Sequence, residues 1–446
     1  MAECDVLVVG SGPAGMGAAL GASWSGANVI IVERFGFMGG NPTVSLVNPL
    51  MSWHTHRGAP KRGGVTLLPQ DHGPGDPVVA GALAVFLNNL IQAGGALAPT
   101  EATGYTVPFD PEIYKLVALD TLDQAGANIL LHSRASGTWG KRCAPEGVVF
   151  ETKSGPVVIA AKAIVDCTGD GDVAAFAGAK FQFGREPDGR VQPMTLMFRI
   201  VDFNRDQFAA YIKINPAQWR GVHGLWDLIK QASERGDLKL PREDILLFAT
   251  PHPGELSANC TRVTEANGID VLDITRAEIE ARRQMRDIMR FLNKYVPGFE
   301  RSYVVQSGNS IGVRETRRII GEYILTVDDV LEARKFDDAI ARASYPVDIH
   351  NPTGIGTILQ RLPEGQWYEV PLRCLIPKGV DNLLVAGRCI SGTHEAHSSY
   401  RVTPTAMATG QAAGVCAALA ASSRRQPRMV NAAEVQFKLR QQGAIV

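Results

Sequence analysis

Apolar residues near the start of the chain form short unbroken runs. Asp5 to Val9 is rich in β-branched residues, and a second run, Asn28 to Val32, ends at Glu33. Runs of this length are typical of strands buried on both faces of a sheet. The residues between them, Met16 to Ser25, are small and compatible with a helix. The pattern predicts a strand, a helix and a second buried strand.

Glycines mark the junction between the first strand and the helix. Gly10 permits a tight turn, Gly12 lets a ligand approach the backbone, and Gly15 lets the helix pack against the strand. The helix start attracts a pyrophosphate, and an acid about twenty residues further on binds a ribose. A glycine turn without a ligand is the alternative, but the full order of elements favours a dinucleotide site. The predicted site comprises Gly10, Gly12, Pro13, Ala14, Gly15 and Glu33.

Two later stretches repeat this arrangement. VIAAKAIVDCTGDGD predicts a buried strand that ends at Thr168, Gly169 and Asp170. VDNLLVAGRCIS, near the C-terminus, predicts another that ends at Gly387 and Arg388. Strands from both ends of the chain that feed glycine turns indicate one long ligand held from two sides.

Composition narrows the class of protein. The chain of 446 residues suggests two or three domains. Lys plus Arg and Asp plus Glu both number 45, so no strong field favours nucleic acid. Apolar runs stay below the roughly twenty residues of a membrane span. The seven cysteines form no CxxC pair, which argues against a metal centre and favours a reducing, cytoplasmic location.

The sequence resembles the two-dinucleotide-fold flavoproteins, the group that contains glutathione reductase and fumarate reductase. More narrowly, it is similar to bacterial FAD-dependent oxidoreductases with a glycine-rich loop after the ribose acid. The motifs concerned include VVGSGPAGMGAA, VERFGFMGGNPT, DCTGDGDVAAFAGA and NLLVAGRCISGTHEAHSSYRVTPTAMATGQAAG. The resemblance implies an α/β fold, in which a discontinuous, Rossmann-like FAD-binding domain carries an inserted α+β substrate or cap domain. The expected boundaries are 1–180 and 372–446 for the FAD domain and 181–371 for the insertion, with 303–325 returning to the FAD domain.

The resemblance also implies a set of FAD contacts. Relatives carry Gly-Asp after the last strand, whereas this chain has Gly387 and Arg388, and the arginine could bind the pyrophosphate instead. One GxGxxG-type turn argues against a separate NAD(P)H domain. Besides the first glycine turn and Glu33, the implied contacts are Arg34, Gly39, Gly40, Asn41, Ala135, Thr168, Gly169, Asp170, Gly387 and Arg388.

Arg401 to Ala421 predicts a helix capped by Thr403, with Pro404 at its first position. The unsatisfied N–H groups and the positive dipole end at a helix start stabilise negative charge. Thr405 and Ala406 are therefore expected at the pyrimidine edge of the flavin. The alternative is a helix that serves packing alone.

Polar residues suited to proton transfer precede this helix in GTHEAHSSYRV. His394 or His397 is the expected general base, and Arg401 is expected to hold the substrate. Arg314, in SIGVRETRR, could orient a carboxylate or carbonyl, or could form a structural pair with the next glutamate. His350, in YPVDIHNP, is a further candidate, with a capping or core histidine as the alternative.

The expected function is dehydrogenation of a small organic substrate, with a hydride passing to FAD and oxygen, a quinone or another carrier as final acceptor. An NAD(P)H-dependent flavin monooxygenase and a non-catalytic binding protein on the same fold are the alternatives. An insertion rich in Gly, Pro and His, from Ser52 to Pro77, is expected either to cover the site or to form a surface loop.

Overall fold

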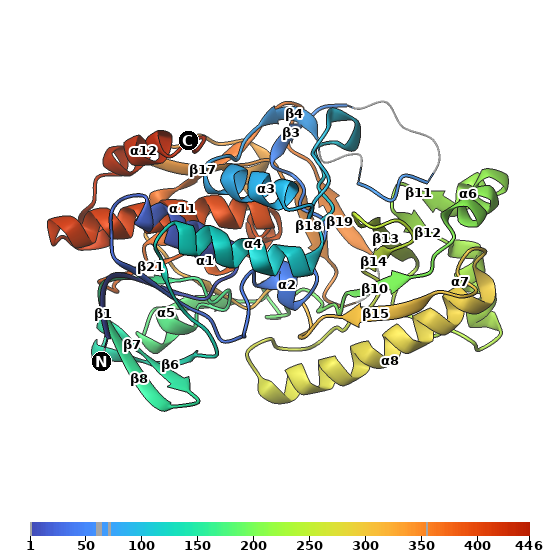
Figure 1. Ribbon diagram of the computed structural model, residues 1–446, viewed down its shortest axis with the longest axis horizontal. Helices are drawn as coiled ribbons and strands as arrows, with labels where there is room; N and C mark the ends of the chain where they lie inside the picture. The colour runs from blue at the N-terminus through green and yellow to red at the C-terminus, as the bar shows by residue number, and fades with distance from the viewer. Residues whose placement is uncertain (1, 59–64, 70–72, 354–355) are drawn as a thin grey trace.

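The computed structural model describes residues 2–58, 65–69, 73–353 and 356–446 (Figure 1). Parts of the predicted Ser52–Pro77 insertion, at 59–64 and 70–72, lie outside these residues. None of the helices in the described ranges combines the length and the apolar character that crossing a bilayer requires.

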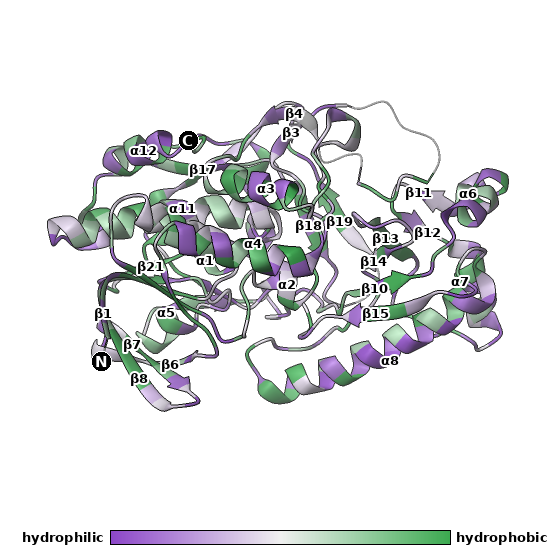
Figure 2. Cartoon of the chain, in the orientation of Figure 1, coloured by the Kyte–Doolittle hydropathy of each residue, from purple (hydrophilic) through white to green (hydrophobic). Residues whose placement is uncertain are grey.

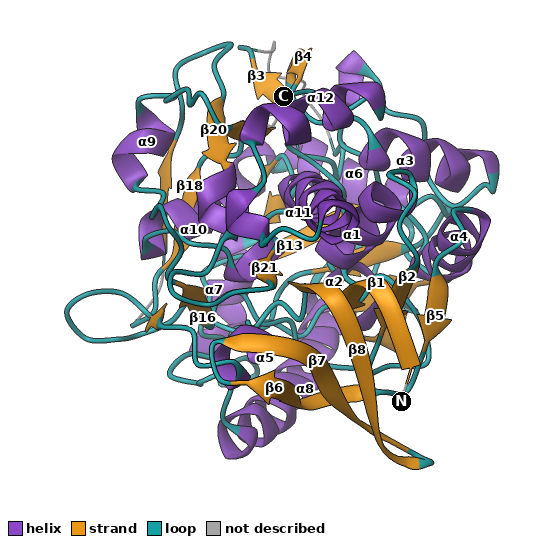
Figure 3. Cartoon of the chain, turned by 90° about the vertical axis from the view of Figure 1, so that its left-hand side faces the viewer, coloured by secondary structure: helices purple, strands orange, loops and turns teal. Residues whose placement is uncertain are grey.

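A seven-stranded sheet forms the centre of the described chain, in the order β5-β2-β1-β8-β7-β6, with β21 also paired to β8. β1 runs parallel to β2 and β8, and the β2–β5 and β8–β21 pairs are parallel as well. Figure 3 shows β8, β1 and β2 side by side, with α1 and α11 on one face. The strands are β1 (Ala2–Val9), β2 (Val29–Val32), β5 (Asn128–Leu130), β6 (Arg134–Lys141), β7 (Ala144–Thr152), β8 (Gly155–Asp166) and β21 (Leu383–Val385).

The unbroken apolar runs of the sequence form the inner strands of this sheet. Val6, Leu7 and Val8 of β1 are fully buried, as Ile164 and Val165 of β8 are. Both faces of these strands are covered, so each position along them must be apolar. The α/β class with a parallel, Rossmann-like sheet is confirmed by this topology.

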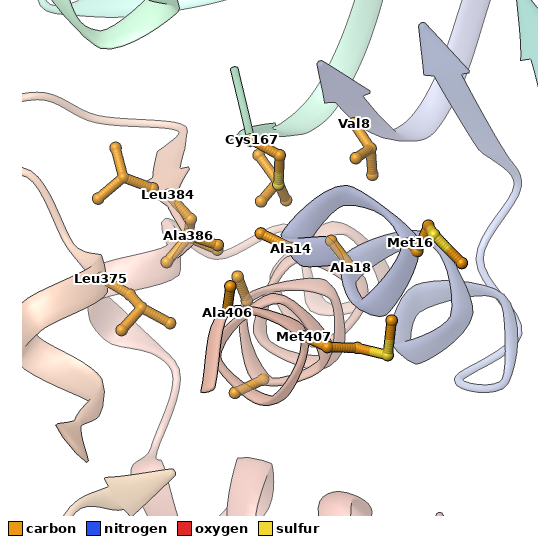
Figure 4. Close-up of a cluster of buried hydrophobic side chains, with 14 of the residues drawn as sticks. Val8, Ala14, Met16, Ala18, Cys167, Leu375, Leu384, Ala386, Ala406 and Met407 are labelled. Carbon is orange, nitrogen blue, oxygen red and sulfur yellow. The ribbon is translucent and has the colours of Figure 1, made fainter. Parts of the chain in front are cut away.

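Helices α1 (Pro13–Ser23) and α11 (Thr403–Ser423) pack backbone to backbone on this sheet. A Cβ at Gly17 would lie 2.2 Å from Met407 O, and one at Gly414 would lie 2.0 Å from Ala18 O. Figure 4 shows Ala14 and Ala18 of α1 against Met407 of α11. Side chains larger than hydrogen would push the two helices apart. The glycines at this contact are Gly17, Gly21, Gly410 and Gly414.

The second sheet has the order β11-β12-β13-β14-β10-β15 and is antiparallel within the described residues. The amphipathic helix α8 (Val271–Tyr295) packs beside it, with Ile288 and Leu292 in its core. Figure 2 shows polar and apolar bands alternating along α8. The strands are β10 (Phe198–Val201), β11 (Trp219–Arg220), β12 (His223–Gly224), β13 (Ile245–Ala249), β14 (Leu256–Ala258) and β15 (Tyr303–Ser307).

The other described elements surround the two sheets. Two-stranded pairs are β3 (His54–His56) with β4 (Pro74–Pro77), β9 (Phe181–Phe183) with β16 (Arg317–Ile319), β17 (Ala339–Ala343) with β20 (Tyr368–Pro371), and β18 (Val347–His350) with β19 (Thr357–Gln360). Further helices are α2 (Asn41–Val44), α3 (Ala82–Gln92), α4 (Pro111–Gln124), α5 (Asp172–Phe176), α6 (Arg205–Ile214), α7 (Trp226–Glu234), α9 (Val327–Leu331), α10 (His394–Tyr400) and α12 (Ala432–Gln441).

Each sheet has its own apolar core. The larger core joins the seven-stranded sheet to α1, α11 and the buried residues between Ile319 and Ile376. The second core lies between Phe198 and Phe299, with Leu67 as a contributor from the earlier insertion. The boundaries 1–180, 181–371 and 372–446 stay a prediction. The buried residues between Ile319 and Ile376 pack in the core of the seven-stranded sheet, although most of them fall within the predicted insertion.

Replacing Gly414 with alanine should destabilise the protein, although alanine is the better helix former by about 1 kcal/mol. The new Cβ would lie 2.0 Å from Ala18 O, a backbone atom that cannot yield without separating α1 from α11. Overpacking costs about 1–3 kcal/mol, so after the gain in helix propensity we expect a net loss of up to about 2 kcal/mol and a lower urea midpoint. Gly137→Ala in β6 is the matched control, because its Cβ would meet nothing within 4 Å. Equal or higher stability of Gly414→Ala would contradict the close contact.

Candidate functional site

A cavity of about 1120 Å³ extends from the main sheet to the second sheet. Its nucleotide end is lined by the residues that follow β1, β2, β8 and β21. Its substrate end is lined by residues of β12, β13 and β18, by the loop that contains Arg314, and by the junction of α10 and α11. The cavity exceeds the roughly 300–1,000 Å³ typical of pockets for drug-sized ligands, so it has room for a larger ligand.

The three glycines of the first turn have different surroundings. Gly10 has φ of +94°, and a Cβ there would lie 2.6 Å from Cys167 O. A Cβ at Gly15 would lie 1.8 Å from Gly10 O, so the protein's own packing requires glycine at both positions. A Cβ at Gly12 would approach nothing closer than Gly40 Cα at 3.7 Å, and Gly12 lines the cavity. Glycine at position 12 therefore serves whatever enters the cavity, which fits a pyrophosphate against the backbone.

The Glu33 carboxylate is fixed at the edge of the same turn. Its Oε2 accepts hydrogen bonds from Ser11 N at 2.9 Å and Ser11 Oγ at 2.7 Å. Its Oε1 accepts one from Phe35 N at 3.0 Å. A carboxylate has about four acceptor positions, so these three bonds leave capacity for a ligand hydroxyl. Glu33 lines the cavity, as a ribose-binding acid must.

Most of the predicted cofactor residues meet around the nucleotide end. Gly15, Gly39 and Thr405 do not line the cavity, although Gly39 N donates to Ser11 O at 3.0 Å and so ties the second loop to the first turn. The predicted residues that line it are Gly10, Gly12, Pro13, Ala14, Glu33, Arg34, Gly40, Asn41, Ala135, Thr168, Gly169, Asp170, Gly387, Arg388 and Ala406. Their roles toward FAD stay predictions, and their placement fits a dinucleotide.

Arg388 forms an ion pair with another predicted cofactor residue. Its Nη2 lies 2.7 Å from Asp170 Oδ1, which also accepts a hydrogen bond from Thr316 Oγ1 at 2.7 Å. The pair joins the carboxyl ends of β8 and β21 at the cavity wall. Arg388 therefore balances a neighbouring carboxylate, and a contact with the pyrophosphate stays a prediction.

Helix α11 begins at the cavity wall, as predicted, but its cap differs. Val402 is the N-cap residue, Thr403 is the first helical residue, and no side chain caps the helix. The prediction of Thr403 as cap is wrong by one position, because α10 runs directly into α11 with Val402 as the extended residue between them. The first-turn N–H groups remain available to a ligand. Val402, Thr403, Pro404 and Ala406 line the cavity.

The predicted bases His394 and His397 lie in helix α10 and do not line the cavity. His394 Nδ1 lies 2.9 Å from Glu315 Oε1, and that carboxylate also binds the Arg318 guanidinium. His397 is fully buried, and neither ring nitrogen has a hydrogen-bond partner among the described residues. Burial, and then the charge of Arg318, lowers its pKa well below the usual range. Both rings are directed into protein packing.

His350, at the end of β18, lines the substrate end of the cavity. Its Nε2 lies 3.6 Å from Asp348 Oδ2, and Thr357 Oγ1 lies 3.4 Å from its Nδ1. Burial, and then the charge of Arg314, lowers the pKa of His350 to about 4. Arg401 Nη2 lies 3.9 Å from the same Asp348 oxygen. Two segments about 50 residues apart thus bring a neutral histidine and an arginine around one carboxylate.

Arg314 also lines the substrate end, and its partners are not those of a structural Arg–Glu pair. Its Nη1 donates to Pro193 O and to Thr195 Oγ1, both at 2.7 Å. The adjacent Glu315 is fully buried and binds Arg318 and His394 instead. The sequence allows either a substrate-binding arginine or an Arg–Glu pair in this segment. In the structure Arg314 lines the cavity and Glu315 is buried with other partners, so the two do not pair.

Sequence reasoning missed a second histidine–carboxylate pair at this end. His223 Nδ1 lies 2.8 Å from Asp244 Oδ2, and Arg242 Nη2 lies 3.3 Å from Asp244 Oδ1. All three residues line the cavity, yet no motif marks them in the sequence. Asp348, in contrast, stands in the YPVDIHNP motif beside His350 and was available as a signal. The described residues gather no group of three or more His, Cys, Asp or Glu that could hold a metal ion.

Replacing Gly12 with valine should remove bound FAD and leave the fold intact. The new side chain would project into the cavity where the backbone faces the ligand, while the nearest protein atom to its Cβ is 3.7 Å away. The 450 nm absorbance of the purified protein and its urea unfolding report the two effects. Gly137→Ala should keep FAD. A yellow Gly12→Val protein would contradict the assignment, and so would one that fails to fold.

Known proteins similar to this chain are flavoenzymes of several kinds. A geranylgeranyl bacteriochlorophyll reductase-like protein of Thermoplasma acidophilum is 14% identical, with 99% of this chain and 83% of that chain covered and a TM-score of 0.47. A flavoprotein/dehydrogenase of Cytophaga hutchinsonii is 14% identical, with coverage of 98% and 82% and a TM-score of 0.44. The anhydrotetracycline hydroxylase OxyS of Streptomyces rimosus is 12% identical, with coverage of 99% and 66% and a TM-score of 0.44. Similarity at this level identifies neither substrate nor reaction.

The comparison with curated protein sequences gives no match. Residues 5–439, nearly the whole chain, match the family model described as FAD dependent oxidoreductase. The matched range includes both halves of the nucleotide end, from the first glycine turn to α11. The cofactor is therefore FAD, and the chain belongs to the family of FAD-dependent oxidoreductases.

Proposed function

We propose that this oxidoreductase dehydrogenates a small organic substrate at a CH–OH, CH–NH or CH–CH group. The observation that carries the proposal is His350, a neutral histidine on the wall of the cavity that the glycine turn and the start of α11 also line. A base must be deprotonated and within reach of the substrate to accept a proton. His350 meets the first condition at neutral pH, and its place in the cavity supports the second.

The nucleotide end supplies the residues that would hold FAD. The turn at Gly12 would face the pyrophosphate, and Glu33 would accept a hydrogen bond from the adenosine ribose. When bound, FAD would supply an acceptor for the hydride that leaves the substrate carbon. The N–H groups at the start of α11 would stabilise negative charge on the flavin ring, because they carry the positive end of the helix dipole.

The charged and polar neighbours of His350 favour one ring nitrogen as the atom that accepts the proton. Asp348 has its pKa lowered, despite burial, chiefly by the neighbouring His350 and Arg401, so it is ionised and only accepts hydrogen bonds. The ring proton therefore belongs on Nε2, which faces Asp348 at 3.6 Å. Nδ1 is left with the lone pair, and Thr357 Oγ1 beside it at 3.4 Å can orient the ring. We infer that Nδ1 is the basic atom.

The buried positions of His394 and His397 favour a structural part for both in this proposal. The contact of His394 with Glu315, which also binds Arg318, holds α10 against the segment that contains Glu315.

The specific relation to glutathione reductase-like flavoproteins and the cytoplasmic location remain predictions. So does the electron acceptor. Flavin reduction by NADPH alone, at micromolar concentration, would favour the monooxygenase alternative.

The His350→Gln variant should keep FAD and reduce it slowly. Loss of a general base typically costs about a hundredfold to ten-thousandfold in rate. The measurement is anaerobic stopped-flow bleaching of the flavin, by a compound selected from a panel of alcohols, hydroxy acids, amines and amino acids for bleaching the wild type. His252→Gln is the control, since His252 contacts Asp110 away from the cavity. A wild-type rate in His350→Gln would move the base elsewhere, and His223 would be tested next.

The pH dependence of kcat/KM should have an acidic limb near pH 4. This parameter reports the free enzyme, in which His350 has a pKa of about 4 and must be neutral to accept a proton. Activity is therefore retained above that pH and lost as pH falls through it. Arg314→Gln removes a charge that lowers this pKa, so the limb should move to higher pH, which no ionisation of the substrate can mimic. A limb at pH 6.5 in wild type would contradict the assignment.

A further inference from the structure

The positive charge of Arg314 is not balanced by a carboxylate within the described residues. Its Nη1 donates to two neutral oxygens, Pro193 O and Thr195 Oγ1, each at 2.7 Å. Its Nε and Nη2 make no hydrogen bond to the described part of the chain, and the side chain lines the cavity. A partly buried cation of this kind is costly unless an anion accompanies it.

Other arginines lie close to Arg314. Burial, and then the charges of Arg401 and Arg242, lowers its pKa to about 9, with Asp348 acting in the opposite direction. Arginine in water titrates far above this range, because it is neither buried nor beside other cations. The substrate end is thus prepared for an anion.

The carboxylates at this end are already engaged. Asp348 Oδ2 accepts a hydrogen bond from the Tyr345 hydroxyl at 2.8 Å, and His350 and Arg401 lie 3.6 and 3.9 Å from it. Asp244, the other carboxylate at the substrate end, is bound by the histidine and the arginine described above. Three arginines and two occupied carboxylates line this end, which leaves one positive charge for a ligand.

The arginines lie beside the proposed base. His350 Nε2 and Arg401 Nη2 both approach the same oxygen of Asp348. An acid group held by the arginines would therefore lie close to the imidazole ring, so only a carbon adjacent to that acid group stays near the histidine, whereas a remote acid group would carry the reacting carbon away. Met197, Leu246 and Phe248 line the same region and can contact an apolar side chain.

We propose that the substrate is a 2-hydroxy or 2-amino carboxylic acid whose carboxylate is bound by Arg314 and Arg401. This rests on the proposed function and adds the class of substrate. A guanidinium presents N–H groups in a planar fork that matches the two carboxylate oxygens. The hydroxyl or amino group on the next carbon then lies toward His350.

The test is binding, read from the perturbation of the visible flavin spectrum of the FAD-loaded protein. The probes are lactate, its isomer 3-hydroxypropionate and its neutral counterpart lactamide, together with mandelate and mandelamide. A lost charge-assisted pair of hydrogen bonds weakens binding about tenfold or more. We expect the apparent Kd of lactate or mandelate to be at least tenfold lower than that of its amide. Lactate should also bind more tightly than 3-hydroxypropionate. Equal binding of acids and amides, or no perturbation by either acid, would overturn the proposal.

Variants assign the effect to the arginines. Arg314→Gln should bring the apparent Kd values of acid and amide together, and Arg401→Gln should do the same if the first variant does not fold. Arg314→Lys keeps the charge without the fork, so it should retain part of the preference. Arg286→Gln, on the exposed face of α8, is the control and should bind as wild type does. If Arg314→Gln alters the flavin spectrum but leaves the ratio of the Kd values for acid and amide unchanged, the charge of Arg314 acts on the cofactor and the proposal fails.

The same experiment separates this inference from the proposed function. His350→Gln should still bind lactate or mandelate at least tenfold more tightly than its amide, because both arginines are unchanged, and should reduce flavin slowly. Tight acid binding, with no compound in the panel able to bleach the flavin, would leave the anion site intact and overturn the dehydrogenase. Bleaching by neutral alcohols alone would support the dehydrogenase and overturn the proposed carboxylate site.

Discussion

The contact of α1 with α11 is the constraint on which the site depends. Glycines on both helices let the two backbones meet, with Gly17 against Met407 O and Gly414 against Ala18 O. Both helices begin at the cavity, so this one contact sets where two helix starts face a shared ligand. In the proposed function, one start would face the pyrophosphate and the other the flavin. A shift of either helix would then misplace the positive helix end that stabilises one of these two groups.

Much of the nucleotide end could be predicted from sequence because its signals are local. A strand, a turn and a helix start are encoded within about fifteen residues, with glycines where a side chain would meet neighbouring backbone or the ligand. The inner strands can also be predicted from the sequence, since burial on both faces requires a continuous apolar run. The cap of α11 lies one residue earlier than the sequence indicates, because α10 continues to Tyr400 and only Arg401 and Val402 separate the two helices.

The substrate end was harder to predict because its residues meet through tertiary packing. The spacing of His394 and His397 does not say which face of α10 points inward, and Glu315, which binds His394, lies 79 positions away. His223 and Asp244 stand 21 positions apart with no motif around them. His350 was recognised as a candidate, but its importance depends on Asp348 and Arg401, whose convergence only the fold reveals.

The pairing of α1 with α11, which lies several hundred residues later in the chain, also governs how this protein can fold. Gln442 donates to Gly21 O across 421 positions, and β21, a late strand, completes the sheet beside β8. Contacts of such sequence separation form slowly, because a long loop must close before they give any gain. During synthesis, the face of α1 that α11 buries stays exposed until α11 leaves the ribosome. The nascent chain therefore needs protection from aggregation over the whole stretch between the two helices, and the FAD site is complete only after α11 has been made.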